Sequence, residues 1–258
     1  MLSIINKQSR GFVLNGDEIG YYSFETWELL KLLKSPKPME RTLAARNLGK
    51  SIEYHIVENL LAALDTEKKL YPKIEICNSL AMFGAHSVAG LVLRLGTIGK
   101  NQHLTVPGEP FRKNSYPLPR DIAARTLIRI GEIALPQLFE VLLWDEKPKI
   151  SEAIDAIGFI CNKDPHPEYL GELKTCYRKH FNSELIRWKL FRAMSSFPDS
   201  YPFLEDRFAN ETQPAIRQEI KRSLDKHQKT LNINKSTNYG YNDQGSNRKR
   251  FRGYCRNV

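Results

Sequence analysis

The sequence predicts an all-α protein, an α-solenoid in which about five helical hairpins are stacked. The clearest hairpin spans residues 120–144, where apolar side chains recur at helical spacing on both sides of Gly131. A glycine at this joint can adopt the positive φ that ends a helix and reverses the chain. The pattern recurs 47 residues earlier and pairs Leu80 with Leu127, Phe83 with Ile130, Gly84 with Gly131, Val88 with Leu135, Leu91 with Leu138 and Leu95 with Leu142.

The N-terminal residues 1–22 are the least regular part of the sequence. Asn15 and Gly16 stand between two short apolar runs, which predicts a β-hairpin or, failing that, a disordered segment. Ser23 then offers an N-cap to a helix that reaches Lys34.

The hairpins follow one another from here to residue 228. The first pair is predicted over residues 39–48 and 53–64, and the second over 74–83 and 86–95. The pair at 120–144 comes third. A fourth is predicted over 150–157, with Gly158 at the joint, and 168–180, and a fifth over 183–195 and 201–209. A mostly polar helix over 214–228 is expected to cap the open end of the stack.

Two stretches carry the resemblance to a known family. Residues 41–49, Arg-Thr-Leu-Ala-Ala-Arg-Asn-Leu-Gly, and residues 123–138, which begin Ala-Ala-Arg-Thr-Leu and end Leu-Pro-Gln-Leu, resemble HEAT repeats of the phycobilisome-lyase-like variety. The resemblance covers about residues 35–228. It implies a right-handed stack whose second helices line a concave, partner-binding surface, with candidate contacts at Glu58, Arg94, Gln137, Glu140 and Trp144.

An insertion at residues 97–118 separates two of the repeats. Insertions in solenoids project from one face, and loops of this length are usually either functional or disordered. Its basic and aromatic side chains suit a phosphate or a peptide, and the alternative is a connector without a role. The candidate contacts are Phe111, Arg112, Lys113 and Tyr116.

The C-terminal residues 229–258 carry much of the net charge of +10, with seven Lys or Arg against one acid. They are poor in aliphatic residues, so we expect a disordered tail. Arginines beside aromatic rings suit single-stranded nucleic acid, because the cations meet phosphates and the rings stack on bases. The alternative is a solubilising tail. The candidate nucleic-acid contacts are Arg248, Lys249, Arg250, Phe251, Arg252, Tyr254 and Arg256.

Four Cys and His residues lie within 20 residues of one another and could hold a zinc ion: Cys161, His166, Cys176 and His180. The cysteines also fall on apolar helical stripes, and their spacing matches no established zinc module. We therefore expect core cysteines and neither a metal nor another cofactor.

Catalytic motifs are missing from the sequence. It contains no glycine-rich phosphate loop, no Gly-x-Ser-x-Gly and no His-Glu-x-x-His. The family resemblance also implies DNA glycosylase-like or bilin lyase-like activity as alternatives. No residue of this sequence indicates an active site for either activity. No apolar run approaches the roughly 20 residues of a spanning helix, and the N-terminus lacks the apolar core of a signal peptide. The sequence thus predicts a non-catalytic cytoplasmic scaffold that binds a protein, with nucleic-acid binding through the tail as the alternative.

Overall fold

The computed structural model describes residues 6–14, 16–17, 19–109, 111, 113 and 115–239, with side chains as far as residue 229. Within these residues the protein is all-α and no strand occurs. The α-helices are α2 (Thr26–Leu32), α3 (Pro38–Leu48), α4 (Ile56–Thr66), α5 (Leu70–Met82), α6 (Ala85–Leu93), α7 (Ile122–Ile130), α8 (Leu135–Val141), α9 (Lys147–Lys163), α10 (Leu170–Lys179), α11 (Glu184–Met194), α12 (Tyr201–Asn210) and α13 (Pro214–Tyr239). Short 3₁₀ helices η1 (Ile19–Tyr21), η2 (Gly131–Ala134), η3 (Pro167–Tyr169) and η4 (Pro198–Ser200) join some of them.

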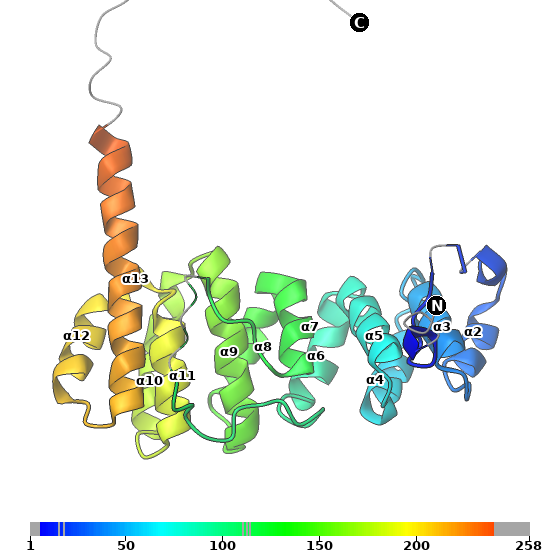
Figure 1. Cartoon of the computed structure of the whole chain (residues 1–258), viewed down its shortest axis with the longest axis horizontal. Helices are drawn as coiled ribbons and strands as arrows, with labels where there is room; N and C mark the ends of the chain where they lie inside the picture. The colour runs from blue at the N-terminus through cyan, green and yellow to red at the C-terminus, as the bar shows by residue number, and fades with distance from the viewer. Residues whose placement is uncertain are drawn as a thin grey trace, which may run out of the picture.

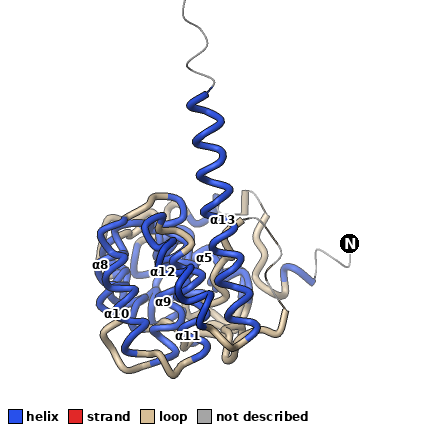
Figure 2. Tube along the Cα trace, turned by 90° about the vertical axis from the view of Figure 1, so that its left-hand side faces the viewer, coloured by secondary structure: helices blue, strands red, loops and turns tan. Residues whose placement is uncertain are grey.

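The helices follow one another along the long axis of the molecule (Figure 1). Contacts run from α3 to α5, α7, α9, α11 and α13 in turn, and we call these helices the first-helix row. The helix before each later member packs against it: α4 on α5, α6 on α7, α8 on α9, α10 on α11 and α12 on α13. We call α4, α6, α8, α10 and α12 the second-helix row. Seen from the end, α8 and α10 lie on one side and α5, α11 and α13 on the other (Figure 2).

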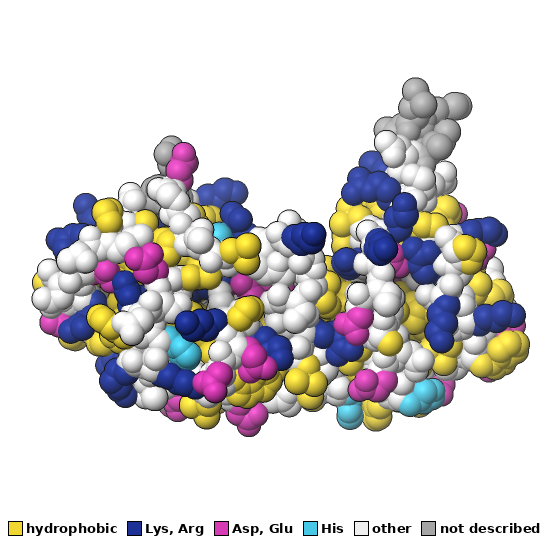
Figure 3. Space-filling view, turned by 90° about the horizontal axis from the view of Figure 1, so that it is seen from below, with side chains coloured by type: hydrophobic (Ala, Val, Ile, Leu, Met, Phe, Trp, Pro, Cys, Tyr) yellow, Lys and Arg dark blue, Asp and Glu magenta, His cyan; other side chains and the backbone are white. Residues whose placement is uncertain are grey.

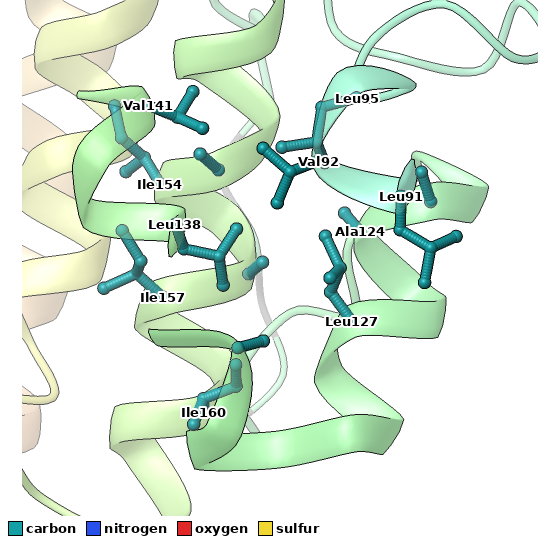
Figure 4. Packing of buried hydrophobic residues seen from close by; sticks show 14 of the residues in the cluster. Leu91, Val92, Leu95, Ala124, Leu127, Leu138, Val141, Ile154, Ile157 and Ile160 are labelled. Carbon is teal, nitrogen blue, oxygen red and sulfur yellow. The ribbon is translucent and has the colours of Figure 1, made fainter. Parts of the chain in front are cut away.

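A continuous apolar core fills the space between the rows. Figure 4 shows Leu91 and Leu138 on neighbouring second helices, with Leu127 between them on α7. All three are fully buried, and so are the other leucines and valine of the matched hairpins. Complete burial of one such side chain contributes about 1.5–3 kcal/mol. The 47-residue match therefore identifies core positions.

Two of the predicted glycine joints have the expected backbone. Gly84 has a φ of 54° and Gly131 has a φ of 84°, a region of backbone conformation that residues with a side chain rarely adopt. Each ends a first helix and lets the chain turn back at once.

The predicted joint at Gly158 is wrong, because α9 continues through it to Lys163. A Cβ at this position would lie 1.9 Å from the Tyr116 hydroxyl and 2.8 Å from Cα of Ala193. The glycine therefore serves the close approach of the insertion and α11 to α9.

Both chain ends also differ from expectation. Residues 12–14 form no strand and Ile19–Tyr21 is a 3₁₀ helix, so the predicted N-terminal hairpin does not form in the described residues; Asn15 lies outside them. Helix α2 is capped by Glu25 rather than by Ser23, in a capping box with Glu28. At the other end, residues 229–239 extend α13 instead of belonging to a disordered tail.

Two further segments cover the first-helix row. The N-terminal segment lies on α3 and α5, where the Thr42 hydroxyl donates to the Gly11 carbonyl at 2.7 Å and the rings of Phe12 and Tyr71 meet at 5.1 Å. The insertion leaves α6, runs past the starts of α9 and α11 and returns to α7 (Figure 1). Its His103 ring packs on Trp188 of α11, and its Tyr116 ring packs on Phe159 of α9.

Candidate functional site

A groove of about 600 Å³ opens between α8 and α10 of the second-helix row. Its apolar lining includes Phe139, Leu142, Leu143 and Cys176. Phe139 is held in place by the ring of Tyr169, which stacks on it with centroids 4.2 Å apart. The Leu143 side chain is 69% exposed. An exposed leucine beside an open apolar groove is a feature of protein-binding surfaces.

Acidic side chains dominate the edge of this groove. Glu140 on α8 and Glu172 on α10 are exposed, as is Glu168 in η3. Of the two nearby cations, Lys179 is already engaged, since its Nζ donates to the carbonyls of Leu143 and Trp144 at 2.6 and 2.8 Å. The groove thus presents three carboxylates around an apolar floor, of which Glu168 also pairs with His166 at 3.1 Å, and Arg178 is the second cation in the lining.

The residues predicted to contact a partner lie in different environments. Glu140 lines the groove between α8 and α10, whereas Gln137 is partly buried one turn earlier on α8. Glu58 is exposed on α4. The Arg94 guanidinium is committed to Asp65 through two hydrogen bonds of 2.7 Å. Trp144 is half-buried, with Lys149 Nζ 5.3 Å from its ring centroid.

The insertion does not present its predicted gripping residues together. Tyr116 is only 8% exposed and fits against Gly158, so it is a core residue. Phe111 is half-buried beside Arg222, 6.0 Å from ring centroid to guanidinium. Lys113 is exposed, and Arg112 lies outside the described residues. The apolar surface of α9 explains the burial of Tyr116, because a large ring gains most by covering it.

The four candidate zinc ligands do not converge. Cys161 on α9 and Cys176 on α10 are buried in the core cluster, and burial raises the pKa of each thiol to about 12. Both thiols therefore have the character of small apolar core side chains. Among the described residues, the one group of at least three metal-ligating side chains consists of His166 with Glu132 and Asp164. In the part of the chain that the structure describes, the four candidate ligands therefore do not come together as a group.

A buried network of charged residues was not predicted at all. Lys189 of α11 is fully buried, and its Nζ lies 2.7 Å from Glu152 Oε1 and 2.8 Å from Asp155 Oδ2, both on α9. Burial is the main reason why the pKa of Glu152 rises to about 7. Lys189 and the ionised Asp155 act on it in opposite directions.

The network continues from α11 to α13. Arg192 lies 3.4 Å from Glu219, and Arg222 lies 2.5 Å from the same carboxylate. The Arg192 guanidinium also covers the Trp188 ring at 3.8 Å. We define the charge network as Glu152, Asp155, Lys189, Arg192, Glu219 and Arg222. With three acids and three bases it is formally neutral when all six are ionised.

The sequence does contain a signal for this network. Each of the three helices carries its charged pair at i and i+3, namely Glu152 and Asp155, Lys189 and Arg192, and Glu219 and Arg222. Side chains at this spacing share one helix face. The spacing places each pair on one face of its helix, and the packing of α9, α11 and α13 brings the three faces together.

Neither the family models nor the curated proteins give a match. A crystal structure described as an engineered protein of the Northeast Structural Genomics Consortium aligns over 79% of this chain and 96% of its own, with 16% identity and a TM-score of 0.38. A likeness at that level carries no argument about fold or function. Within the described residues, no helix has the length and apolar character that crossing a membrane requires.

Proposed function

We propose that the protein is a non-catalytic, HEAT-like α-solenoid scaffold that binds a protein partner along its second-helix row. The groove between α8 and α10 would seat a segment of that partner. The observation that carries the proposal is the contrast between the rows. The N-terminal segment and the insertion cover the first-helix row, whereas the second-helix row keeps an open apolar groove that includes the exposed Leu143.

The chemistry of the groove favours a basic segment with an apolar anchor. A large apolar side chain would replace water over Phe139 and Leu142, and such anchors dominate binding energy. Lys or Arg beside the anchor would meet Glu140, Glu168 and Glu172. These exposed pairs would act mainly on specificity and association rate, and they would weaken with salt.

Nucleic-acid binding remains the second candidate, and it rests on the composition of the C-terminal sequence. The candidate residues 248–256 lie outside the described residues. On the face seen in Figure 3, basic and acidic side chains are interspersed, so that face offers a polyanion no continuous basic track. Deletion of residues 240–258 should abolish salt-sensitive RNA or DNA binding if the tail is responsible.

Selection from a displayed peptide library tests the groove directly. We expect enriched peptides to combine a large apolar residue with Lys or Arg, and to lose at least about tenfold in affinity for Leu143→Glu. Met82→Glu is the matched control, since Met82 is 64% exposed on α5 of the opposite row. Peptides that bind Leu143→Glu as tightly as the parent protein would exclude this groove as the site.

A further inference from the structure

A second pocket, of about 420 Å³, lies between the insertion and the starts of α9 and α11. The insertion contributes the residues from Gly96 to Leu104 that line it, and the helices contribute Pro148, Ser151, Glu152, Ser183, Leu185 and Ile186. The volume is in the range of small-molecule sites, and the walls are mostly apolar. This pocket is separate from the groove between α8 and α10, so the following proposal does not depend on the partner-binding proposal.

Two polar side chains of this pocket contain buried atoms without a hydrogen-bond partner. Glu152 is only 1% exposed, and its Oε1 accepts from Lys189 while its Oε2 has no partner. His103 Nδ1 is likewise buried and unpaired. Leaving such an atom unsatisfied costs about 1–3 kcal/mol, and natural proteins usually satisfy it with a protein group or an ordered water. Since both residues line the pocket, a ligand with matching polar groups could satisfy these atoms as well.

The insertion is fixed before any ligand enters. The Asp121 carboxylate accepts from Gln102 Nε2 at 2.8 Å and from the Gly96 amide at 3.2 Å, which ties the insertion back to the start of α7. The His103 ring is held 5.2 Å from Trp188. A preformed site of this kind loses little conformational entropy on binding.

We propose that this pocket binds a small, neutral, amino-substituted heteroaromatic ring of about nucleobase size. An exocyclic N–H would donate to Glu152 Oε2, and a ring nitrogen or a second N–H would meet His103. Apolar walls that include Leu104, Leu185 and Ile186 suit a flat ring.

A cationic ligand fits the site less well than a neutral one. The charge network is already formally neutral, so a bound cation would leave it with an unbalanced positive charge. Lys100 and Lys147 also line the pocket and would repel a cation. A neutral N–H donor satisfies the carboxylate oxygen without disturbing this balance.

Matched pairs of probes test the proposal on the full chain. Calorimetry or ligand-observed NMR would compare adenine with purine, and 2-aminopyrimidine with pyrimidine, since each pair differs by the amino group alone. We expect at least one amino compound to bind at least about tenfold more tightly than its partner, because the compound without the amino group leaves Glu152 unpaired. Failure of both amino compounds to bind, or equal binding within both pairs, would overturn the proposal.

Three variants test where the ligand binds and which group recognises it. Ser183→Trp should fill the pocket and abolish binding; the Ser183 side chain makes no capping hydrogen bond, so its loss leaves α11 intact. Ser115→Trp, at an exposed position of the insertion away from the pocket lining, is the control and should bind normally. Glu152→Gln should remove the preference for the amino compound. Binding that survives Ser183→Trp in a folded protein would refute this site.

Discussion

The contact between α3 and α5 and the contact among α9, α11 and α13 are built on one plan with different chemistry. Between α3 and α5, the buried polar groups are hydroxyls, and Ser79 Oγ donates to the Ala45 carbonyl at 2.7 Å. The contact among α9, α11 and α13 has hydroxyls of the same kind, since Ser196 Oγ donates to the Gly158 carbonyl at 2.8 Å and Ser223 Oγ donates to the Phe191 carbonyl at 3.0 Å. In addition, Lys189 inserts between two carboxylates of α9. The fully buried polar groups of the first contact are thus neutral, and its ion pair between Arg46 and Glu75 is partly exposed. The second contact adds fully buried ions.

The two contacts differ in how far they tolerate changes in the residues around them. A hydroxyl that donates to a helix carbonyl is satisfied by one backbone atom and tolerates small changes nearby. A buried ion needs its partners in place, because its desolvation costs several kcal/mol. The later repeats therefore depend on the joint placement of three helices, and the insertion that covers them completes their burial.

The largest expected effect follows from removing the central cation. Lys189→Met leaves Glu152 and Asp155 buried without their partner and should lower the free energy of unfolding by about 3–5 kcal/mol. Chemical denaturation monitored by circular dichroism measures this loss.

The matched change in the earlier contact is Ser79→Ala. It removes one neutral hydrogen bond and should cost only about 1 kcal/mol. Adding Glu152→Gln to Lys189→Met should recover part of the larger loss, because one buried carboxylate is then gone. If Lys189→Met and Ser79→Ala have equal effects, the charge network is not what distinguishes the two contacts.

An intermediate effect is expected at Gly158, where α9 meets both the insertion and α11. In Gly158→Ala the new methyl group would lie 2.8 Å from Cα of Ala193, so backbone must shift, and we expect a loss of about 1–3 kcal/mol in thermal or chemical unfolding.

Tyr116→Phe separates the two clashes at this glycine. It removes the hydroxyl, which has no hydrogen-bond partner, and alone should change stability by less than about 1 kcal/mol. Combined with Gly158→Ala it should relieve the contact with the insertion but not the one with Ala193. Full recovery in the double variant would show that α11 does not constrain this position.

The sequence predicted the order of the helices and much of the core, because both depend on local patterns. Leu80 and Leu127, placed at equivalent positions by the 47-residue match, are both fully buried. The glycines at 84 and 131 have the positive φ that a tight helical joint requires. Helical spacing and turn chemistry are properties of adjacent residues, and the sequence displays them directly.

The errors come from tertiary contacts. Gly158 looked like a third joint, yet α9 passes through it, and the missing side chain instead lets the insertion and α11 approach the helix closely. Tyr116 looked like a binding residue, and only its partners Gly158 and Phe159 show that it is buried. Nothing was predicted for Lys189, whose burial depends on the two carboxylates that α9 supplies. The groove at Glu140 depends on how α10 sits beside α8, which no local pattern specifies.

The smallest predicted effect is on the pH dependence of stability. We expect the two regions to lose stability over different pH ranges. Burial, together with Lys189, Arg120 and Arg192, lowers the pKa of His103 to about 4, while Asp155 acts in the opposite direction. The unfolded chain therefore takes up this proton first as the pH falls. The stability due to neutral His103 is fully present above about pH 6.5 and is lost progressively towards pH 4.

His103→Gln should flatten this part of the stability curve. The difference between the unfolding free energies at pH 7 and pH 4.5 should be smaller in the variant than in the parent, by on the order of 1 kcal/mol. Glu152, whose raised pKa favours folding as the pH falls from about 7, is present in both proteins and cancels from the difference. In the earlier repeats, burial tends to raise the pKa of Glu67, but hydrogen bonds from Arg41 and backbone amides outweigh it and lower that pKa, so its contribution fails only below about pH 4.5. Arg41→Met should therefore lower the free energy of unfolding at neutral pH, and its difference from the parent should shrink only below about pH 4.5. Parallel curves for the parent and His103→Gln between pH 7 and 4.5 would mean that His103 is not buried beside these cations in solution.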